Sequence, residues 1–432
     1  MPFSKREQEK FVPALNVLEV KFVNSVKLDL IEYYIFNNKI GVTMSEGIHT
    51  GFDEQQYPHI NRGLDGIVAF STTKSFIDGQ KGELIYSGYL IDTLAENATF
   101  EEVCFLLWND RLPNSKELES LKKLLIENRE LPQPILDYIN ATDKEAEPMA
   151  VLRTAVSMLA DFDDTKGKYD STLFEGQAIA ITAKIPSIIA AFDRVRHDKD
   201  VVAPLKEGST AFNFLYMLNG EKPGEQAEKT MDLCLILHAE HGMNASTFTA
   251  RTIGATQSDM YSAITGAIGA LKGPLHGGAN TAVMNTLLEL DKDPDTADAV
   301  EFTKKKLANK EKISGFGHRV YKTFDPRARL LQKMSKDLSE ETGHEELYEW
   351  SMDMLNTMKS EKDIDPNVDF FSATVYYSIG IQPDLFTCIF TMSRVSGWTG
   401  HYMEQAANNR LIRPRALYVG EKHLDWVPVK ER

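Results

Sequence analysis

Sequence typical of β-strands is confined to one short stretch of this chain, residues 67–89. Two segments rich in β-branched and aromatic residues, 75–77 and 84–86, flank the turn-forming residues 78–82. This pattern predicts a β-hairpin. From residue 90 onward the apolar side chains recur at helical spacing almost throughout, so we expect a helix content far above the usual third. The sequence therefore predicts an all-α fold with one small β-hairpin near the start of its core.

Several helix boundaries can be predicted from local chemistry. Thr99 and Glu102 have the spacing of a capping box ahead of an apolar helix face. Residues 225–241 read as one long helix that ends at Gly242. Residues 383–398 are apolar nearly all round, which is typical of a buried helix.

Length and charge limit the classes of function. With 432 residues, 42% of them apolar, the chain has enough material for more than one domain. Its formal charge of −15 argues against binding nucleic acid, whose phosphates require clustered lysine and arginine. No apolar run approaches the roughly 18 residues that a membrane-spanning helix needs.

The three cysteines, Cys104, Cys234 and Cys388, lie in apolar, helix-like runs without C-x-x-C spacing. This sparse set favours buried thiols in a reducing compartment over a disulfide framework or a zinc site. Residues 1–60 contain one arginine and several acidic residues, so they do not resemble a transit peptide. We therefore expect a cytoplasmic protein.

Two short glycine-rich segments each carry a single histidine. They are GPLHGGAN at 273–280, with His276, and GFGHRVYK at 315–322, with His318. Glycine allows the backbone to approach a ligand closely, and histidine exchanges protons near neutral pH. Each segment alone fits a plain turn with an exposed histidine equally well. Because there are two of them, followed by Asp369, we expect parts of one site.

A second pair of histidines, His238 and His241, lies three residues apart at the end of a predicted helix. The zinc motif H-E-x-x-H requires histidines four apart with glutamate after the first, so this spacing argues against a metal site. A plain helix end, with His241 favoured by the C-terminal dipole, stays open as an interpretation.

Three charged residues stand in unusual surroundings. Arg327 follows Asp325 and a proline in the predicted first turn of a helix, where the dipole disfavours a cation; it is either a bound anion's partner or a surface arginine. Asp369 lies among aromatic residues, where burial would raise its pKa, or else it caps a helix. Arg394 interrupts a run that is otherwise core, where a lone charge needs a partner.

Taken together, these residues form a set suited to carbon–carbon bond formation. Arginines bind carboxylates through two hydrogen bonds, and histidines stabilise charge that develops on a carbonyl oxygen. A carboxylate can remove a proton from carbon next to a carbonyl. The set therefore fits a reaction between an enolised acyl group and an anionic keto acid, without metal ligands. Arg413 and Arg415 alone fit a solvated basic turn.

The same motifs resemble the citrate synthase family, in order and in spacing. They are HAEHGMNAST at 238–247, GPLHGGAN at 273–280, GFGHRVYK followed by DPR at 315–327, PNVDFFS at 366–372 and IRPR at 412–415. The resemblance covers about residues 61–432. It is closer to the bacterial and archaeal forms than to the mitochondrial one.

This resemblance implies a helical homodimer with two domains in each subunit. The large domain would comprise residues 61–278 and 380–432, and the small domain residues 279–379. Residues 1–60 would form an N-terminal extension, and they do not match the N-terminal region of the NADH-inhibited forms. Ser87 stands where the family commonly has arginine, so no ligand role is assigned to that loop.

The resemblance also implies roles for individual residues in an acyltransferase that makes citrate from acetyl-CoA and oxaloacetate. Asp369 would remove a methyl proton from acetyl-CoA, His276 would hydrogen-bond the thioester oxygen, and His318 would polarise the oxaloacetate carbonyl. Oxaloacetate would be held by His241, Arg327, Arg394 and, from the other subunit, Arg413. The CoA site would be lined by Ile313, Gly315, Phe316, Gly317 and Asn367. Neither a metal nor a cofactor beyond the CoA thioester substrate is implied.

Three other functions stay open. A 2-methylcitrate synthase would use the same motifs with propionyl-CoA, and one methylene in a pocket is worth only about 1–3 kcal/mol, so dual activity stays open as well. A metal-dependent hydrolase would use the histidines as ligands. A non-catalytic helical scaffold would need neither His276 nor Asp369 for anything except stability.

Overall fold

The computed structural model of this chain describes residues 60–432 except 65, 166, 293–297 and 319. Residues Phe70–Arg413 form one compact unit. Residues 60–69 and Pro414–Arg432 belong to a second unit. The predicted N-terminal extension, apart from residue 60, lies outside the described residues.

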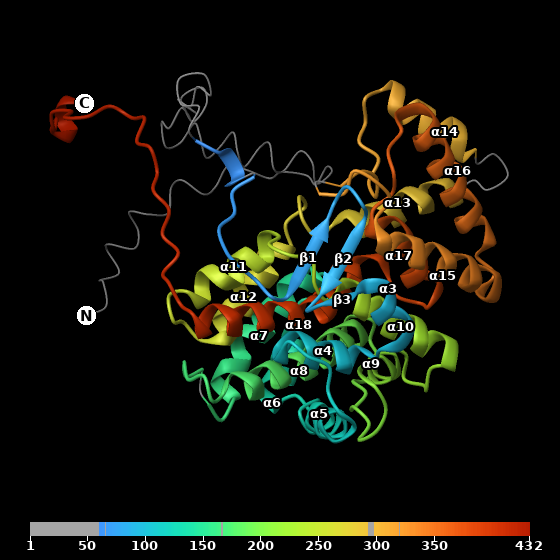
Figure 1. Ribbon diagram of the computed structural model, residues 1–432, viewed down its shortest axis with the longest axis horizontal. Helices are drawn as coiled ribbons and strands as arrows, with labels where there is room; N and C mark the ends of the chain where they lie inside the picture. Colours follow the sequence, from blue (N-terminus) through green and yellow to red (C-terminus); the bar gives the residue numbers. More distant parts are fainter. Residues whose placement is uncertain (1–59, 65, 166, 293–297, 319) are drawn as a thin grey trace, which may run out of the picture. The chain divides into compact units, whose positions relative to one another are not determined.

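The described residues are mainly helical, as predicted, with sixteen α-helices and one small sheet (Figure 1). The strands are β1 (Ser75–Asp78), β2 (Glu83–Tyr86) and β3 (Tyr89–Leu90). The helices are α3 (Ile91–Asn97), α4 (Phe100–Asn109), α5 (Ser115–Glu127), α6 (Gln133–Ala141), α7 (Pro148–Phe162), α8 (Phe174–Arg196), α9 (Thr210–Asn219), α10 (Glu225–His238), α11 (Ala245–Gly254), α12 (Met260–Leu271), α13 (Ala279–Asp291), α14 (Ala299–Ala308), α15 (Pro326–Thr342), α16 (Glu345–Lys362), α17 (Val368–Ser378) and α18 (Phe386–Ala407). Short 3₁₀ turns, η1 (Arg62–Leu64), η2 (Pro383–Leu385) and η3 (Val429–Glu431), complete the set.

The predicted β-hairpin is confirmed. Strands β1 and β2 pair antiparallel, with Ser75 opposite Tyr86 and Asp78 opposite Glu83. The turn between them is closed by the Asp78 carboxylate, which accepts hydrogen bonds from two backbone amides of the turn. Strand β3 pairs with β2 over only two residues. Such a short strand shows no alternation of apolar and polar side chains, so the sequence does not predict it.

Helix α18 is the centre of the larger group of helices. It packs against α4, α8, α10, α11 and α12, and its side chains from Phe386 to Tyr402 are buried. The prediction of a helix buried on all sides is confirmed. Glycines allow the closest crossings: a Cβ at Gly400 would lie 2.6 Å from the carbonyl oxygen of Leu107 in α4.

Helices α13 to α17 pack mainly against one another. Helix α15 packs against α16 and α17, α13 against α17, and α14 against α16 (Figure 1). Links to the larger group run through α13 and α18, and through α15 with α3 and α10. The division into domains at residues 279 and 379 stays a prediction.

Local capping chemistry determines several helix ends. The capping box of Thr99 and Glu102 is present at the start of α4. The predicted end of α10 is wrong by three residues, since the helix ends at His238 rather than at 241. There the Glu240 carboxylate accepts a hydrogen bond from the amide of Gly242, and such a local side-chain bond competes with the next helical turn.

Candidate active site

Two of the predicted site histidines lie side by side although they are far apart in the sequence. The ring centroids of His241, which follows α10, and His318, in the segment before α15, are 5.1 Å apart. Tyr321 joins them, because its hydroxyl lies 3.2 Å from Nε2 of His241 and its ring centroid lies 4.7 Å from that of His318. Desolvation and the nearby Arg327 guanidinium hold the pKa of His241 well below its ordinary value.

The surroundings of His318 determine its protonation. Its Nδ1 accepts hydrogen bonds from the backbone amides of Val320 at 3.0 Å and Tyr321 at 3.2 Å, so Nδ1 carries no proton. Desolvation, helped by the positive charge of Arg327, lowers the pKa of His318 to about 4. His318 is therefore neutral near pH 7 and has its one N–H at Nε2, free to donate to a ligand.

His276 lies in the link between α12 and α13 and is held by Ser246. The Ser246 hydroxyl is 2.8 Å from Nε2 of His276, and the Ser246 amide also donates to that atom at 3.4 Å. Trp398 Nε1 donates to the same hydroxyl at 3.1 Å. Since Nε2 accepts from the amide, the proton of the neutral ring lies on Nδ1. Desolvation lowers the pKa of His276 to about 4, and Arg394 contributes.

Arg327 occupies the first turn of α15, as predicted, and its charge is balanced within that turn. Asp325, the N-cap residue, binds its guanidinium through two hydrogen bonds of 3.0 and 2.8 Å. The same carboxylate accepts from the amide of Val368 at the start of α17, at 3.2 Å. Both Asp325 and Arg327 are buried. The pair therefore joins the N-termini of two helices next to His318.

Asp369 lies in the first turn of α17, and the alternative that it caps this helix is wrong. The N-cap is Asn367, whose side chain accepts from the amide of Asp369. Desolvation raises the pKa of Asp369 to about 6, although Arg327 and Arg394 partly oppose the rise. A carboxylate with this pKa is ionised near neutral pH and is a stronger base than an exposed aspartate.

Arg394 is a buried cation that contacts neutral groups directly and is stabilised by the negative charge of Glu240. It is 1% exposed, its Nε donates to the carbonyl oxygen of His238 at 2.7 Å, and its guanidinium lies 4.7 Å from the ring centroid of Phe390. Desolvation lowers its pKa to about 10, so it stays charged at pH 7. Its charge acts on both His276 and Asp369, which indicates that these groups share one region.

The predicted CoA-binding loop is bound to the segment before α17. Gly317 donates to the carbonyl of Asp365, and Asn367 donates through its amide to Gly315 and through its side chain to Gly317, each at 2.9 Å. Gly315 has φ +84°, and a Cβ there would collide with Phe370, so only glycine fits. Phe316 is partly buried and Ile313 is buried.

Arg413 is the one predicted site residue that lies apart. It is exposed, six residues after the end of α18, and it does not contribute to the contacts of His241, His318 or Arg394 described above. The charge of Arg327 acts on His241, His318 and Asp369, and the charge of Arg394 acts on His241, His276 and Asp369.

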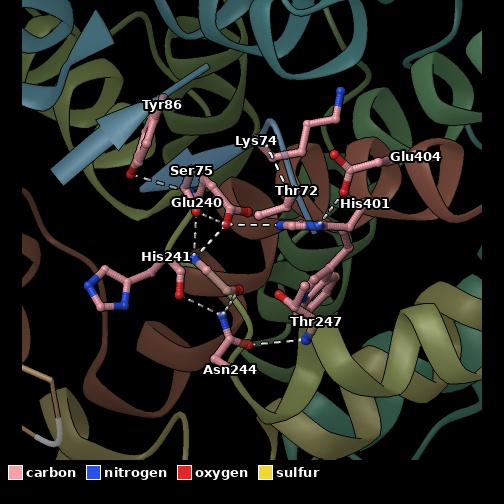
Figure 2. Close-up of polar contacts among 12 residues, drawn as sticks. Thr72, Lys74, Ser75, Tyr86, Glu240, His241, Asn244, Thr247, His401 and Glu404 are labelled. Atoms are coloured by element: carbon pink, nitrogen blue, oxygen red, sulfur yellow. Dashed lines mark hydrogen bonds and ion pairs between the residues drawn. The ribbon is translucent and has the colours of Figure 1, made fainter. Parts of the chain in front are cut away.

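Sequence reasoning missed a buried polar cluster beneath His241. Glu240 accepts hydrogen bonds from Ser75 at 3.0 Å and from Nε2 of His401 at 3.1 Å, and all atoms of Glu240 and His401 are buried (Figure 2). Arg251 lies 3.2 Å from Nδ1 of His401 and also pairs with Glu404. Glu240 and His401 are 161 residues apart, so no local spacing could reveal the cluster.

Two cavities of the described residues lie away from these histidines. One of about 820 Å³ is lined by α5 and residues 204–206, and one of about 840 Å³ borders α10 and includes Glu101 and Asp232. These two carboxylates accept from the backbone amides of Thr210 and Phe100, at the starts of helices. They therefore act as helix caps, and the chemistry concentrates around the histidines instead.

The described residues contain neither a metal-binding cluster nor a membrane-spanning helix. Among these residues, no group of three or more histidine, cysteine, aspartate or glutamate side chains is arranged to hold a metal ion. Within the same residues, no helix has the length and apolar character needed to cross a membrane.

Comparison with known proteins identifies the relatives of this chain. It is 50% identical over 373 residues to citrate synthase 2 of Bacillus subtilis, covering 86% of this chain and 99% of that protein. It is 40% identical over 378 residues to 2-methylcitrate synthase 1 of Corynebacterium glutamicum, covering 86% and 98%. Among solved structures, citrate synthase from Thermoplasma acidophilum, in a ternary complex with carboxymethyl coenzyme A and oxaloacetate, matches with a TM-score of 0.81 and 34% identity, over 86% of this chain and 99% of that one.

The family profile described as citrate synthase, C-terminal domain, matches residues 63–415. The match includes all the residues of the candidate site. Family, fold and sequence motifs agree: this chain belongs to the citrate synthase family.

Proposed function

We propose that this enzyme, an acyltransferase, condenses acetyl-CoA with oxaloacetate and hydrolyses the resulting citryl-CoA to citrate and CoA. The observation that carries the proposal is a charge pattern. Arg394 is a buried cation that keeps its charge. The positive charges of Arg394 and Arg327 act on Asp369, which has a pKa of about 6, and on the neutral histidines His276 and His318. This pattern suits an anionic keto acid, a base and two hydrogen-bond donors.

The first step forms the nucleophile. Ionised Asp369 takes a proton from the methyl carbon of acetyl-CoA, and the electron pair of that C–H bond moves toward the thioester oxygen. Nδ1–H of His276 donates to this oxygen and stabilises the negative charge. A neutral histidine suits this role because its Nε2 is already bonded to Ser246, which holds the ring in one orientation.

The second step forms the carbon–carbon bond. The enol carbon attacks the ketone carbon of oxaloacetate, while Nε2–H of His318 donates to the ketone oxygen as charge develops there. His241, Arg327 and Arg394 hold the two carboxylates of oxaloacetate. Water then hydrolyses the thioester of citryl-CoA, which releases citrate and CoA.

The CoA part of the substrate is proposed to bind along Ile313, Gly315, Phe316, Gly317 and Asn367. The support is the glycine-rich backbone of this loop, which can approach a ligand closely, and its attachment to the segment that carries Asp369. We also propose the two domains stated above, with the small domain, residues 279–379, closing over oxaloacetate to exclude water.

The assembly is proposed to be a homodimer in which Arg413 of each subunit completes the oxaloacetate site of the other. The support is that Arg413 is exposed while the other arginines of the site are buried. A cytoplasmic location and a role in the tricarboxylic acid cycle are proposed with it. The buried free thiols of Cys104, Cys234 and Cys388 suit a reducing compartment.

The deciding experiment measures CoA release from acetyl-CoA with and without oxaloacetate. We expect release to require oxaloacetate and to yield citrate in equal amount. Release of CoA without oxaloacetate would instead indicate a simple thioesterase, and no release under either condition would contradict the proposal.

A second candidate function is 2-methylcitrate synthesis from propionyl-CoA, since one relative named above bears that name. The same assay with propionyl-CoA decides it through the ratio of the two kcat/KM values. We expect acetyl-CoA to be preferred. A preference for propionyl-CoA would assign the chain to the second function, and similar values would indicate dual activity.

A further inference from the structure

The β-hairpin contacts both segments that carry the neighbouring histidines, His241 and His318. Its base lies against the turn after α10, and its tip lies against the segment before α15. The base comprises Ser75 and Tyr86, and the tip comprises the turn residues 79–82. The two ends make separate sets of contacts.

At the base, two residues that face each other across the hairpin hold Glu240. Ser75 of β1 donates to the Glu240 carboxylate at 3.0 Å, and the hydroxyl of Tyr86 in β2 accepts from the Glu240 amide at 3.3 Å and donates to the carbonyl of Leu237 at 3.2 Å. Figure 2 shows Ser75 and Tyr86 converging on Glu240 from the two strands. The residue next to His241 is thereby bound to the hairpin through both its backbone and its side chain.

The turn at Gly242 packs against the same strand. The amide of Gly242 donates to Glu240 and to Ser75. Gly242 has φ +60°, and a Cβ there would lie 3.3 Å from Ile77. Ser75 and Ile77 are two apart in β1, so they share one face of the strand, and that face is occupied by the turn carrying His241.

On the other side, Glu240 is fixed by α18. His401 binds the same carboxylate at 3.1 Å, and a Cβ at Gly397 would lie 2.5 Å from the other carboxylate oxygen. The attraction of His401 helps to keep the pKa of Glu240 below its ordinary value despite burial. The base of the hairpin is therefore anchored to a rigid, charged and buried group.

At the tip, the hairpin turn contacts the segment that follows His318. The amide of Lys322 donates to the carbonyl of Gly79 at 2.8 Å. A Cβ at Gly79 would lie 2.9 Å from the carbonyl carbon of Val320 and would collide with its oxygen, and a Cβ at Gly82 would lie 2.9 Å from Thr323. The backbone of the turn thus lies directly against the backbone of residues 320–323.

We infer that the β1–β2 hairpin is a positioning element that sets the distance between His241 and His318, and so the shape of the oxaloacetate site, through Ser75 at its base and Gly79 at its tip. This inference rests on the proposed function. Tyr321 lies between Val320 and Lys322, which both contact Gly79, and its hydroxyl is 3.2 Å from Nε2 of His241. Moving either end of the hairpin would therefore change the spacing of both histidines.

Gly79 allows a clean test, because it is not among the glycines with positive φ. Alanine is therefore compatible with the backbone there, and the only obstacle is the collision with Val320. We expect Gly79→Ala to move residues 320–323 by about 1 Å and to lower kcat/KM for oxaloacetate about 10- to 100-fold. The KM for oxaloacetate should rise while the KM for acetyl-CoA changes little.

The matched control is Gln80→Ala in the same turn. Gln80 is exposed, and its contact is made by its backbone amide, so this variant should keep the wild-type KM for both substrates within about twofold. Thermal unfolding of both variants shows whether they fold. A folded Gly79→Ala enzyme with wild-type KM and kcat would overturn the inference.

A second variant covers the case in which Gly79→Ala does not fold. Ser75→Ala removes the hydroxyl that joins β1 to Glu240 and Gly242, and we expect it also to raise the KM for oxaloacetate by at least fivefold, with partial rescue in Ser75→Thr. An unchanged KM in Ser75→Ala would refute the positioning role of the base. If the wild-type enzyme makes citrate and both variants have wild-type KM and kcat, the proposed function is intact and only this inference is refuted.

Discussion

At the scale of single residues, burial beside arginine gives the site its protonation states. His276 and His318 have pKa values of about 4, chiefly from desolvation, so both rings are neutral hydrogen-bond donors at pH 7. Asp369 moves the other way, to a pKa of about 6. Of His276, His318 and Asp369, only Asp369 therefore changes its charge just below neutral pH.

The pH dependence of turnover should follow Asp369. Its carboxyl is protonated below pH about 6 and then cannot accept a proton from acetyl-CoA, so we expect kcat to fall about tenfold per pH unit below that value. The neutral histidines predict no second loss between pH 5 and 6. Stopped assays from pH 5 to 8 measure the profile, and Asp369→Asn should lose at least about 1,000-fold in kcat at pH 8 and lack the fall below pH 6. A flat profile in the wild type would contradict this role.

The same carboxylate should reduce stability. Its folded-state pKa of about 6 exceeds the ordinary value of 3.8, so the folded protein binds the proton more tightly than the unfolded chain does. The resulting cost is absent below pH about 4 and complete above pH about 6. A shift of about two pKa units is worth at most about 3 kcal/mol, and we expect Asp369→Asn to be about 1–3 kcal/mol more stable at pH 8.

Denaturant unfolding at pH 8 and pH 4 tests this effect. The gain should shrink to a small fraction of its pH 8 value at pH 4, where the wild-type carboxyl is protonated in the folded state and about half protonated in the unfolded chain. Equal stability of the two proteins at pH 8 would mean that Asp369 is better solvated than its surroundings indicate.

Residues of the candidate site could be predicted from the sequence where a charged residue stands among apolar or aromatic neighbours. Arg394 in an apolar run and Asp369 among aromatic residues stand out because a buried charge is rare. Glu240 and His401 did not stand out, since their burial depends on one another across 161 residues. The pairing of Asp325 with Arg327 depends on side-chain geometry that sequence spacing does not encode.

At the scale of secondary-structure elements, the starts of α15 and α17 share one carboxylate. Asp325 caps α15, binds Arg327 and accepts from the amide of Val368. Removing its charge leaves a buried guanidinium without its carboxylate. Such a change is costly because the remaining charge stays desolvated.

We expect Asp325→Asn to lower the free energy of unfolding by about 3–5 kcal/mol. The matched control lies on the same helix: Lys336→Ala breaks the exposed 3.9 Å pair with Glu340 and should cost less than about 1 kcal/mol. Urea unfolding of both variants measures the difference. Similar small losses in both would show that Arg327 finds other partners when Asp325 is neutral.

Elements could be predicted where local chemistry is decisive. The hairpin and the capping box of α4 follow from turn and cap residues within a few positions. The end of α10 could not be predicted, because Ser75 and Tyr86 of the hairpin hold Glu240 in a turn. There a tertiary contact overrides the helical pattern.

At the scale of the whole molecule, the residues of the candidate site come from segments spread over the chain, and two of these segments contact the hairpin, through Glu240 and through Lys322. Sequence motifs indicate the chemistry of each segment but not the contacts between them. The resemblance to a family supplied the arrangement in advance. Without that resemblance, the sequence predicts a set of residues with suitable chemistry but not their positions relative to one another.

The exposed position of Arg413 leads to a prediction about the proposed dimer. If Arg413 acts in the partner's site, a subunit with Arg413→Ala keeps its own Asp369 and receives an intact arginine from an Asp369→Asn subunit. In a mixed dimer one site then carries both substitutions and the other carries neither. Each variant alone should be nearly inactive.

We therefore expect activity to return when equal amounts of the two variants are unfolded together and refolded. Random pairing places half of the subunits in mixed dimers with one intact site each, so the mixture should reach about a quarter of wild-type activity. Refolding each variant separately and then mixing provides the control, if subunits do not exchange during the assay. No recovery after joint refolding, with wild-type protein regaining its activity under the same conditions, would mean that Arg413 serves its own subunit or no site at all.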